Sequence, residues 1–146
     1  MDVIEAINTR RSIRAYKPNP VPKKVLTELM QTCLSSPSWA NSQPWEFAII
    51  GGAAMEEIRR RNAERVASGA KADTDIPWPS FPDPYMARIR ANGHELFEVL
   101  GIARDDRPKR LEWSVAGARF FDAPNGIILY IDRSLPTYAI LDAGLM

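Results

Sequence analysis

The chain has 146 residues, of which 45% are hydrophobic and 25% are charged. This is the composition of an ordinary globular protein, and the length fits one domain, so disorder over most of the chain is excluded. The 19 basic and 18 acidic side chains leave a formal charge of +1, which gives no general attraction to nucleic acid or to an anionic membrane. No apolar run approaches the ~20 residues that span a bilayer.

The cysteine content and the opening residues indicate a compartment. Cys33 is the only cysteine, which excludes an internal disulfide and is typical of a reducing environment. The opening stretch MDVIEAINTRR lacks the apolar core of a signal peptide. We therefore expect a cytoplasmic protein.

The first half of the sequence predicts three helices and one strand. Asp2 and Glu5 stand at the capping-box spacing, and the prolines of KPNPVP force an extended path before the second helix. The predicted elements are a helix over 2–9, a helix from Pro22 that ends before Pro37, a strand over 45–50 and a helix over 53–68.

The second half predicts an excursion, three helices and one strand, all within a single domain over 1–146. Residues 69–85 hold four prolines, which predict an irregular excursion rather than an element. The run GIILYI is apolar throughout, which predicts a buried strand. The other predicted elements are a helix over 86–100, a charged turn over 104–110, a helix over 111–121 and a helix from Pro136, the strand lying at 126–131.

The last predicted helix has a start signal and no stop signal. LPTYAILDAGLM begins an amphipathic helix without a capping glycine or a basic last turn. Two strands are also too few for a stable open sheet. We therefore expect the chain to be part of a longer fold.

A basic segment follows the first predicted helix. Arg10, Arg11 and Arg14 cluster beside the hydroxyl of Ser12. Guanidinium groups bind phosphate through paired hydrogen bonds, and a serine hydroxyl adds a neutral donor, so the segment is a candidate phosphate site. Cations also compensate the dipole at the end of a helix, and simple compensation on a solvated surface is the alternative interpretation.

A second candidate is the loop PSWANSQPW at 37–45. Two prolines make it rigid, two indoles give it flat apolar surface, and several neutral side chains can form hydrogen bonds. Such a loop suits a flat heteroaromatic ligand. The alternative is a capped turn that leads into the strand and places Trp45 in the core.

The other notable side chains favour structural interpretations. His94 stands near no metal-ligand spacing and is predicted to be structural or solvated, so no metal is expected. Cys33 lies on an apolar helix face and is predicted to be core. The arginines at 59–61 are flanked by glutamates, which predicts a solvated helix face and no nucleic-acid partner. Because no nucleophile or acid–base pair is evident, we expect a cofactor to perform the chemistry if the chain is part of an enzyme.

Taken together, RRSIRAYKPNPVP at 10–22 and SPSWANSQPWEFAII at 36–50 resemble the FMN-dependent nitroreductase family. The later ARFFDAPNGIILYID and PTYAILDAGLM are similar to the family's helix-to-strand segment and to the start of its central helix. The resemblance implies an α+β sandwich with a mostly antiparallel sheet flanked by helices, incomplete at the C-terminus. It also implies an intertwined homodimer with FMN at the interface.

The resemblance also implies roles for particular residues. Arg10 and Ser12 would hold the FMN phosphate, with Arg11 beside them. A cation, Arg14, would lie near the pyrimidine edge of the flavin. The other subunit would line the flavin with one loop: Pro37, Ser38, Trp39 and Asn41. Trp39 stands where the family usually has a small residue, and Arg119 matches a position that is a basic flavin contact in some members.

The implied function is that of an oxidoreductase that uses NAD(P)H to reduce nitroaromatic, quinone or similar electron-poor acceptors through FMN, with ping-pong kinetics. Specificity would depend on the insert at 69–105, a predicted lid. The alternative from another class is a non-catalytic flavin- or nucleotide-binding remnant that acts through a partner chain. Neither hypothesis involves a nucleic acid or a membrane.

Overall fold

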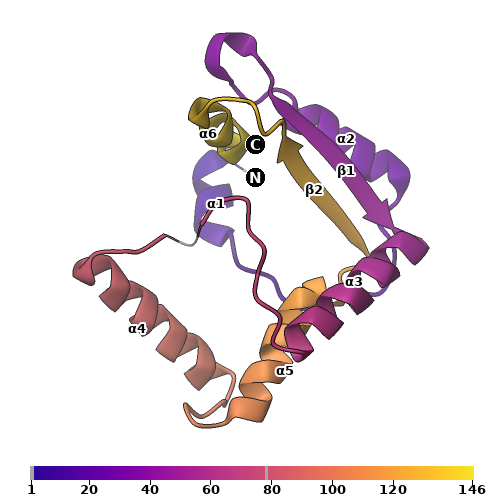
Figure 1. Cartoon of the computed structure of the whole chain (residues 1–146). Coiled ribbons are helices and arrows are strands. Elements are labelled where there is room, and N and C mark those ends of the chain that lie inside the picture. Colours follow the sequence, from indigo (N-terminus) through magenta and orange to yellow (C-terminus); the bar gives the residue numbers. More distant parts are fainter. Residues whose placement is uncertain (1, 78) are drawn as a thin grey trace. The chain divides into compact units, whose positions relative to one another are not determined.

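The computed structural model describes residues 2–77 and 79–146 and is drawn in Figure 1. The chain divides into two compact units. Unit 1 comprises the described residues up to Arg59 together with Phe120–Met146, and unit 2 comprises Arg60–Arg119.

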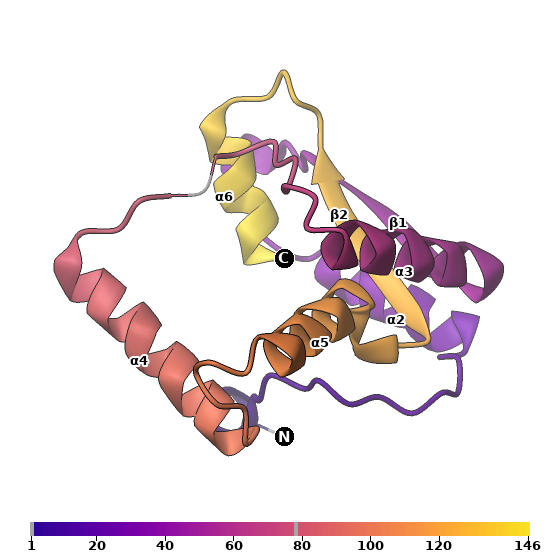
Figure 2. The same cartoon turned by 60° about the horizontal axis from the view of Figure 1, so that its bottom comes forward.

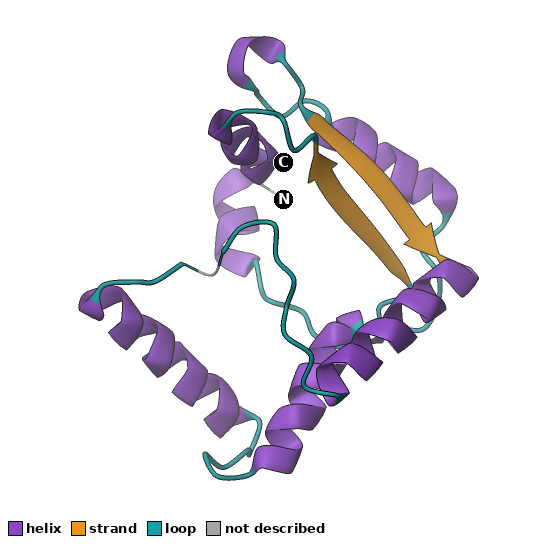
Figure 3. Cartoon of the chain, viewed as in Figure 1, coloured by secondary structure: helices purple, strands orange, loops and turns teal. Residues whose placement is uncertain are grey.

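Unit 1 holds the sheet and most of the helices around it, coloured by type in Figure 3. Its elements are α1 (Val3–Thr9), α2 (Lys23–Cys33), the short 3-10 turn η1 (Trp39–Asn41), β1 (Trp45–Gly51), the first half of α3 (Gly52–Ala67), the 3-10 turn η2 (Phe120–Asp122), β2 (Asn125–Ile131) and α6 (Thr137–Leu145). Unit 2 holds the rest of α3, α4 (Asp83–Val99) and α5 (Arg107–Ala118). None of the helices in the described part of the chain is both long and apolar enough to cross a membrane.

The helix starts show how far local signals fix the elements. Asp2 accepts the backbone N–H of Glu5 at 2.8 Å, which confirms the predicted cap of α1. The predicted charged turn over 104–110 is wrong from Arg107 onward. Asp106 accepts the N–H of Lys109 at 3.1 Å and caps α5 there, and Pro108 suits the first turn of a helix. The excursion also ends earlier than predicted, because α4 begins at Asp83.

The sheet consists of β1 and β2 in antiparallel register, from Trp45 opposite Ile131 to Gly51 opposite Asn125. The antiparallel pairing agrees with the expected fold class. The prediction of a buried strand is wrong, because residues 127–130 are exposed. An apolar run favours burial only where neighbouring elements cover both faces of the sheet, and within the described residues β2 has a single neighbouring strand.

The small core lies where α2, α3 and α6 meet the strands. Its buried apolar side chains are Leu26, Trp45, Met55 and Ala139. Met55 is 2% exposed, and its sulfur lies 3.3 Å from the point that a Cβ on Gly126 would occupy. Gly126 therefore lets α3 approach β2 closely. Cys33, predicted as core, is only half-buried, since it stands at the end of α2.

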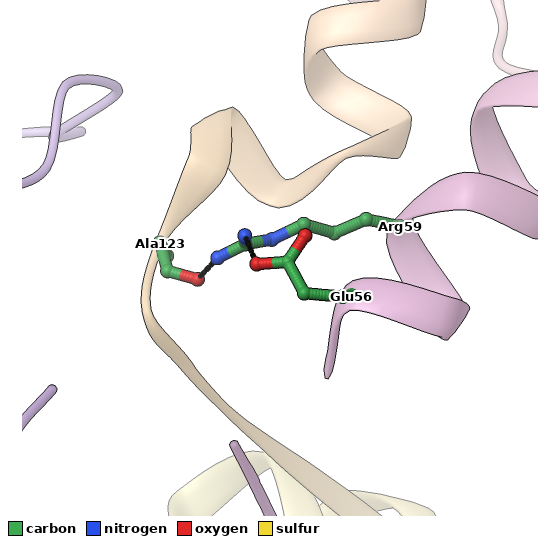
Figure 4. Close-up of polar contacts among 3 residues, drawn as sticks. All are labelled: Glu56, Arg59 and Ala123. Atoms are coloured by element: carbon green, nitrogen blue, oxygen red, sulfur yellow. Dashed lines mark hydrogen bonds and ion pairs between the residues drawn. The ribbon is translucent and has the colours of Figure 1, made fainter. Parts of the chain in front are cut away.

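The burial of Arg59 also corrects the sequence analysis. Residues 59–61 were expected to form a solvated face, yet Arg59 is 6% exposed. Its guanidinium donates to the Ala123 carbonyl and to the Glu56 carboxylate, the latter at 2.5 Å (Figure 4). Ala123 precedes β2, so Arg59 ties α3 to the start of that strand. Arg60 follows the expectation, with an exposed ion pair to Glu64 at 2.7 Å.

Replacing Arg59 should destabilise unit 1. The Arg59→Ala variant leaves the Ala123 carbonyl without its charged donor and opens a cavity, so we expect a loss of about 2–3 kcal/mol in the free energy of unfolding. The Glu56→Gln control should cost at most about 1 kcal/mol, because the Glu56 side chain is 66% exposed. Urea unfolding followed by circular dichroism measures both. Equal losses in the two variants would contradict the assignment.

A cross-strand pair predicts a pH effect. Glu46 lies opposite Tyr130 in the ladder and accepts its hydroxyl at 2.8 Å. This hydrogen bond, together with the charge of Glu46, raises the pKa of Tyr130 above the ordinary value of 10.0. The stabilisation from the pair is therefore complete below pH ~10 and is lost as pH rises through the folded-state pKa.

NMR titration of carbon-13 labelled tyrosines can follow the Tyr130 pKa directly. Glu46→Ala removes both the acceptor and the charge and should return the pKa to the ordinary tyrosine value. Glu46→Gln keeps an acceptor and should lower the pKa only part of the way. Tyr138, which is exposed on α6, serves as the internal control. A Tyr130 titration that is identical in all three proteins would exclude the pair.

Candidate functional site

The basic segment leaves α1 at Arg10, whose backbone turns to extended geometry with ψ 130°. Residues 10–14 are all exposed. The Arg11 guanidinium donates to the carbonyls of Asn8 and Arg10 at 2.8 and 2.9 Å. For Arg11 this contact matches the alternative interpretation, in which a cation compensates the end of a helix. Arg10 and Ser12 present exposed donors of the kind that bind phosphate.

Arg14 is held by an aromatic ring. Its guanidinium carbon lies 6.0 Å from the centre of the Phe121 ring, within the range of a cation–π contact. Phe121 belongs to η2, where Phe120, Phe121 and Asp122 have positive φ values of 56°, 50° and 57°. The turn therefore places the ring under Arg14 through a left-handed backbone that non-glycine residues rarely adopt.

Asn125 fixes the proline-rich segment that follows. In Pro20-Val21-Pro22 only Val21 has a backbone N–H. This N–H donates to Asn125 Oδ1 at 2.8 Å, and Asn125 Nδ2 lies 3.4 Å from the Ile50 carbonyl. The first residue of β2 therefore joins the segment to the sheet. The sequence analysis missed Asn125, because its partner lies 104 residues away.

The loop before β1 is strained and closed on itself. Ala40, Asn41 and Gln43 have φ values of 49°, 56° and 43°, a left-handed geometry that costs roughly 1–2 kcal/mol for an ordinary residue. Ser38 holds the turn, since its Oγ accepts the N–H of Gln43 at 2.9 Å and its carbonyl accepts that of Asn41 at 3.0 Å. Strain of this kind clusters at functional sites.

The two tryptophans of the loop have opposite environments. Trp45 is 6% exposed, which confirms its predicted place in the core, whereas Trp39 is 70% exposed. Pro37 is also exposed, and Ser38 is half-buried. The loop thus anchors one indole and presents the other, so the structural interpretation accounts for Trp45 and leaves Trp39 available to a ligand.

A residue of α6 also holds the loop. Asp142 is 6% exposed, and its Oδ2 accepts the backbone N–H of Trp39 at 3.1 Å. The sequence analysis did not identify Asp142. The signal available was its position as the single charged residue of an otherwise apolar helix.

The structure does not bring the two predicted segments together within one chain. They belong to the same unit, and η1 contacts α6. Figure 2 shows α1, near the N-terminal end of the trace, well apart from α6, although the two overlap in Figure 1. α1, which precedes the basic segment, and α6, which η1 contacts, are therefore separate from each other in this chain.

Unit 2 has a cavity of about 570 Å³ between α4 and α5. Phe97 and Ile102 line it, and Arg110 stacks over Phe97 with its guanidinium carbon 4.0 Å from the ring centre. His94 also lines the cavity and has a side chain that is 81% exposed, which agrees with the predicted solvated environment. None of the residues predicted to bind FMN lines this cavity.

Arg119 and the possible metal ligands complete the predicted site residues. Arg119 is half-buried and follows α5, where its N–H donates to the Val115 carbonyl at 2.9 Å. Among the described residues, no group of three His, Cys, Asp or Glu side chains is arranged to hold a metal ion.

Comparison with known proteins identifies the class. The Nitroreductase family profile matches residues 7–146. Over 137 residues the chain is 32% identical to a nitrobenzene nitroreductase from Ectopseudomonas oleovorans, covering 90% of this chain and 59% of that protein. The chain belongs to the Nitroreductase family, as the sequence motifs indicated.

Solved structures show the same fold. The crystal structure of the FMN and NADPH-dependent nitroreductase NfnB from Sphigopyxis sp. strain HMH superposes with a TM-score of 0.91 at 29% identity, over 99% of this chain and 66% of that one. The FMN-dependent NfnB from Mycobacterium smegmatis, in complex with NADPH, gives 0.90 at 26% identity, over 97% and 64%. The expected α+β nitroreductase fold is therefore confirmed, and the chain spans about three fifths of the length of these relatives.

The strained loop yields a stability prediction. Ala40→Val places a β-branched residue at φ 49°, so we expect a loss of about 1–2 kcal/mol in the free energy of unfolding. Ala40→Gly should stay within about 0.5 kcal/mol of wild type, because relief of strain offsets the greater freedom of the unfolded chain. Urea unfolding measures both.

Ala53, which is exposed in the first turn of α3, provides the matched control. Ala53→Val should cost only about 0.5 kcal/mol, the difference in helix propensity. If valine cost as little at position 40 as at position 53, the left-handed geometry of the loop would be wrong.

Proposed function

We propose that the whole protein is an FMN-dependent oxidoreductase that uses NAD(P)H to reduce nitroaromatic, quinone or similar electron-poor acceptors. The observation that carries the proposal is a pair of segments in a chain of the Nitroreductase family. They are the exposed Arg10–Arg14 and the loop at 37–45, named the Trp39 loop after its exposed tryptophan. The printed names of its relatives support the substrate class: one acts on nitrobenzene, and two structures are of FMN-dependent nitroreductases.

The basic segment has the donor set that an FMN phosphate requires. Arg10 and Ser12 would bind the phosphate oxygens directly, since both are exposed at the end of α1. Arg11 would act mainly through its charge, because Nη1 of its guanidinium already donates to two backbone carbonyls. Arg14, stacked on Phe121, would lie near the pyrimidine edge and stabilise negative charge that develops there.

The loop supplies a surface for the flavin ring. Pro37, Ser38, Trp39 and Asn41 would line it, with the exposed Trp39 indole as a flat contact. The separation of α1 from α6 in one chain (Figure 2) supports a site built from two copies, in which one subunit supplies the arginines and its partner supplies the loop. We therefore include a homodimer in the proposal.

FMN held by these residues would supply the redox chemistry, carrying a hydride from the nicotinamide cofactor to the acceptor, and successive use of one site would give ping-pong kinetics. The chain's own residues would bind and orient the flavin and balance its charge. The insert at 69–105 would act as a lid that sets acceptor specificity.

The single free cysteine, Cys33, supports a reducing compartment, and we place the protein in the cytoplasm.

The experiment is flavin binding by the purified protein and by a double variant. Arg10→Ala combined with Ser12→Ala removes two proposed phosphate donors, so we expect the Kd for FMN to rise about 100-fold. Flavin fluorescence measures the Kd. Bleaching of the visible absorbance by NADH or NADPH under nitrogen, and recovery on adding nitrobenzene, measure the redox reaction.

Lys24→Ala is the control for loss of a surface cation. Lys24 is 87% exposed on α2, and its removal should leave the Kd for FMN within about threefold of wild type. Unchanged FMN affinity in the double variant would contradict the phosphate assignment. A yellow protein that neither nicotinamide cofactor bleaches would instead favour the non-catalytic flavin-binding remnant.

A further inference from the structure

We infer that Asp142 is a positioning residue for the flavin site: its buried carboxylate fixes the Trp39 loop against α6. The inference rests on the proposed function for the identity of the ligand. Asp142 itself would not touch FMN. It would act by holding the backbone of the residue whose indole contacts the flavin.

The first argument is the position of the hydrogen bond. Asp142 Oδ2 accepts the N–H of Trp39 at 3.1 Å, and Trp39 is the first residue of η1. The hydrogen bonds of Ser38 close the loop only on itself. The bond to Asp142 joins it to an element 103 residues away, so it sets where the exposed indole stands relative to the rest of unit 1.

The second argument is the cost of the carboxylate. Asp142 is 6% exposed and is the only charged residue of α6. Burial of a charge carries a large desolvation cost, and well-packed apolar side chains in place of buried ion pairs are often equally or more stabilising. The Asp142 carboxylate is buried and accepts one backbone N–H of a strained loop. We therefore attribute its presence to the position that it gives the loop rather than to a gain in stability.

The third argument is the strain of the loop. Ala40, Asn41 and Gln43 are left-handed, and such a geometry persists only where the surroundings impose it. Asp142 provides an anchor from outside the loop, immediately before the first of these residues. Without this anchor we expect the loop to relax and the Trp39 indole to sample several positions.

The experiment compares variants that separate the acceptor from stability. Asp142→Leu removes the acceptor and suits the apolar helix, and Asp142→Ala removes it without adding volume. Asp142→Asn keeps an oxygen that can accept the N–H. Ala139→Gly weakens the same helix at a residue that is 5% exposed, and it leaves Asp142 in place.

Three quantities are measured for each variant in the full chain: amide hydrogen exchange at Trp39 by NMR, the Kd for FMN, and the free energy of unfolding. We expect Asp142→Leu and Asp142→Ala to raise the exchange rate and the Kd by about tenfold or more, the loss of one hydrogen bond to a charged acceptor. Asp142→Asn should stay within about threefold of wild type in both. Ala139→Gly should lower stability and leave the Kd within about threefold.

The outcomes separate this inference from the proposed function. If wild type binds no FMN, the proposed function fails, and the exchange rates alone decide whether Asp142 holds Trp39. The inference is overturned if exchange at Trp39 is equal in wild type and in both acceptor-less variants. It is also overturned if the Kd for FMN merely follows the unfolding free energy across all four variants, since that pattern indicates a structural role only.

Discussion

The antiparallel ladder between β1 and β2 joins the N-terminal part of unit 1 to its C-terminal part, and the candidate site depends on this pairing. At one end of the ladder Asn125 accepts the N–H of Val21 and so holds the segment that follows the arginines. Beyond the other end, β2 leads into α6, whose Asp142 holds the residue at the start of η1. Hydrogen bonds from β2 and from α6, the helix that follows it, therefore hold both predicted binding segments in place within unit 1. Any shift of register would move both, because one residue of slip reverses every side chain on a strand.

Two buried charges have similar roles near opposite ends of this ladder. Arg59 donates to the carbonyl of Ala123, just before β2, and Asp142 accepts the N–H of Trp39, six residues before β1. Each charged side chain forms a hydrogen bond with a backbone group of a connecting segment. Arg59 also pairs with the Glu56 carboxylate, whereas the bond of Asp142 is to the backbone N–H. Removing either partner leaves a buried polar group unsatisfied, which costs more than the bond contributes. Such pairs therefore fix the path of a loop more than they raise total stability.

The sequence predicted what neighbouring residues determine. Asp2 capped its helix as expected, and the motifs that carry the family resemblance are themselves continuous stretches. The errors about burial arose where distant parts of the chain decide the outcome. Arg59 is buried because Ala123, 64 residues away, accepts its hydrogen bond. Residues 127–130 of β2 are exposed, although an apolar run favours a covered sheet, because within the described residues β2 pairs with a single strand. Asn125 and Asp142 escaped notice for the same reason, since their partners are more than 100 residues distant.

The two left-handed turns show how these long-range bonds bear on function. η1 and η2 each contain non-glycine residues with positive φ, and each precedes a strand. A turn of this kind is unfavourable by itself, so something outside it must hold it. Asp142 bonds the first residue of η1, and Arg59 bonds the residue that follows η2. The turns in turn present Trp39 to solvent and the Phe121 ring to Arg14. In the proposed site, residues remote from the ligand would therefore determine where its contacts stand. By this argument Asp142, a buried acid on a largely apolar helix, would influence ligand binding without touching the ligand.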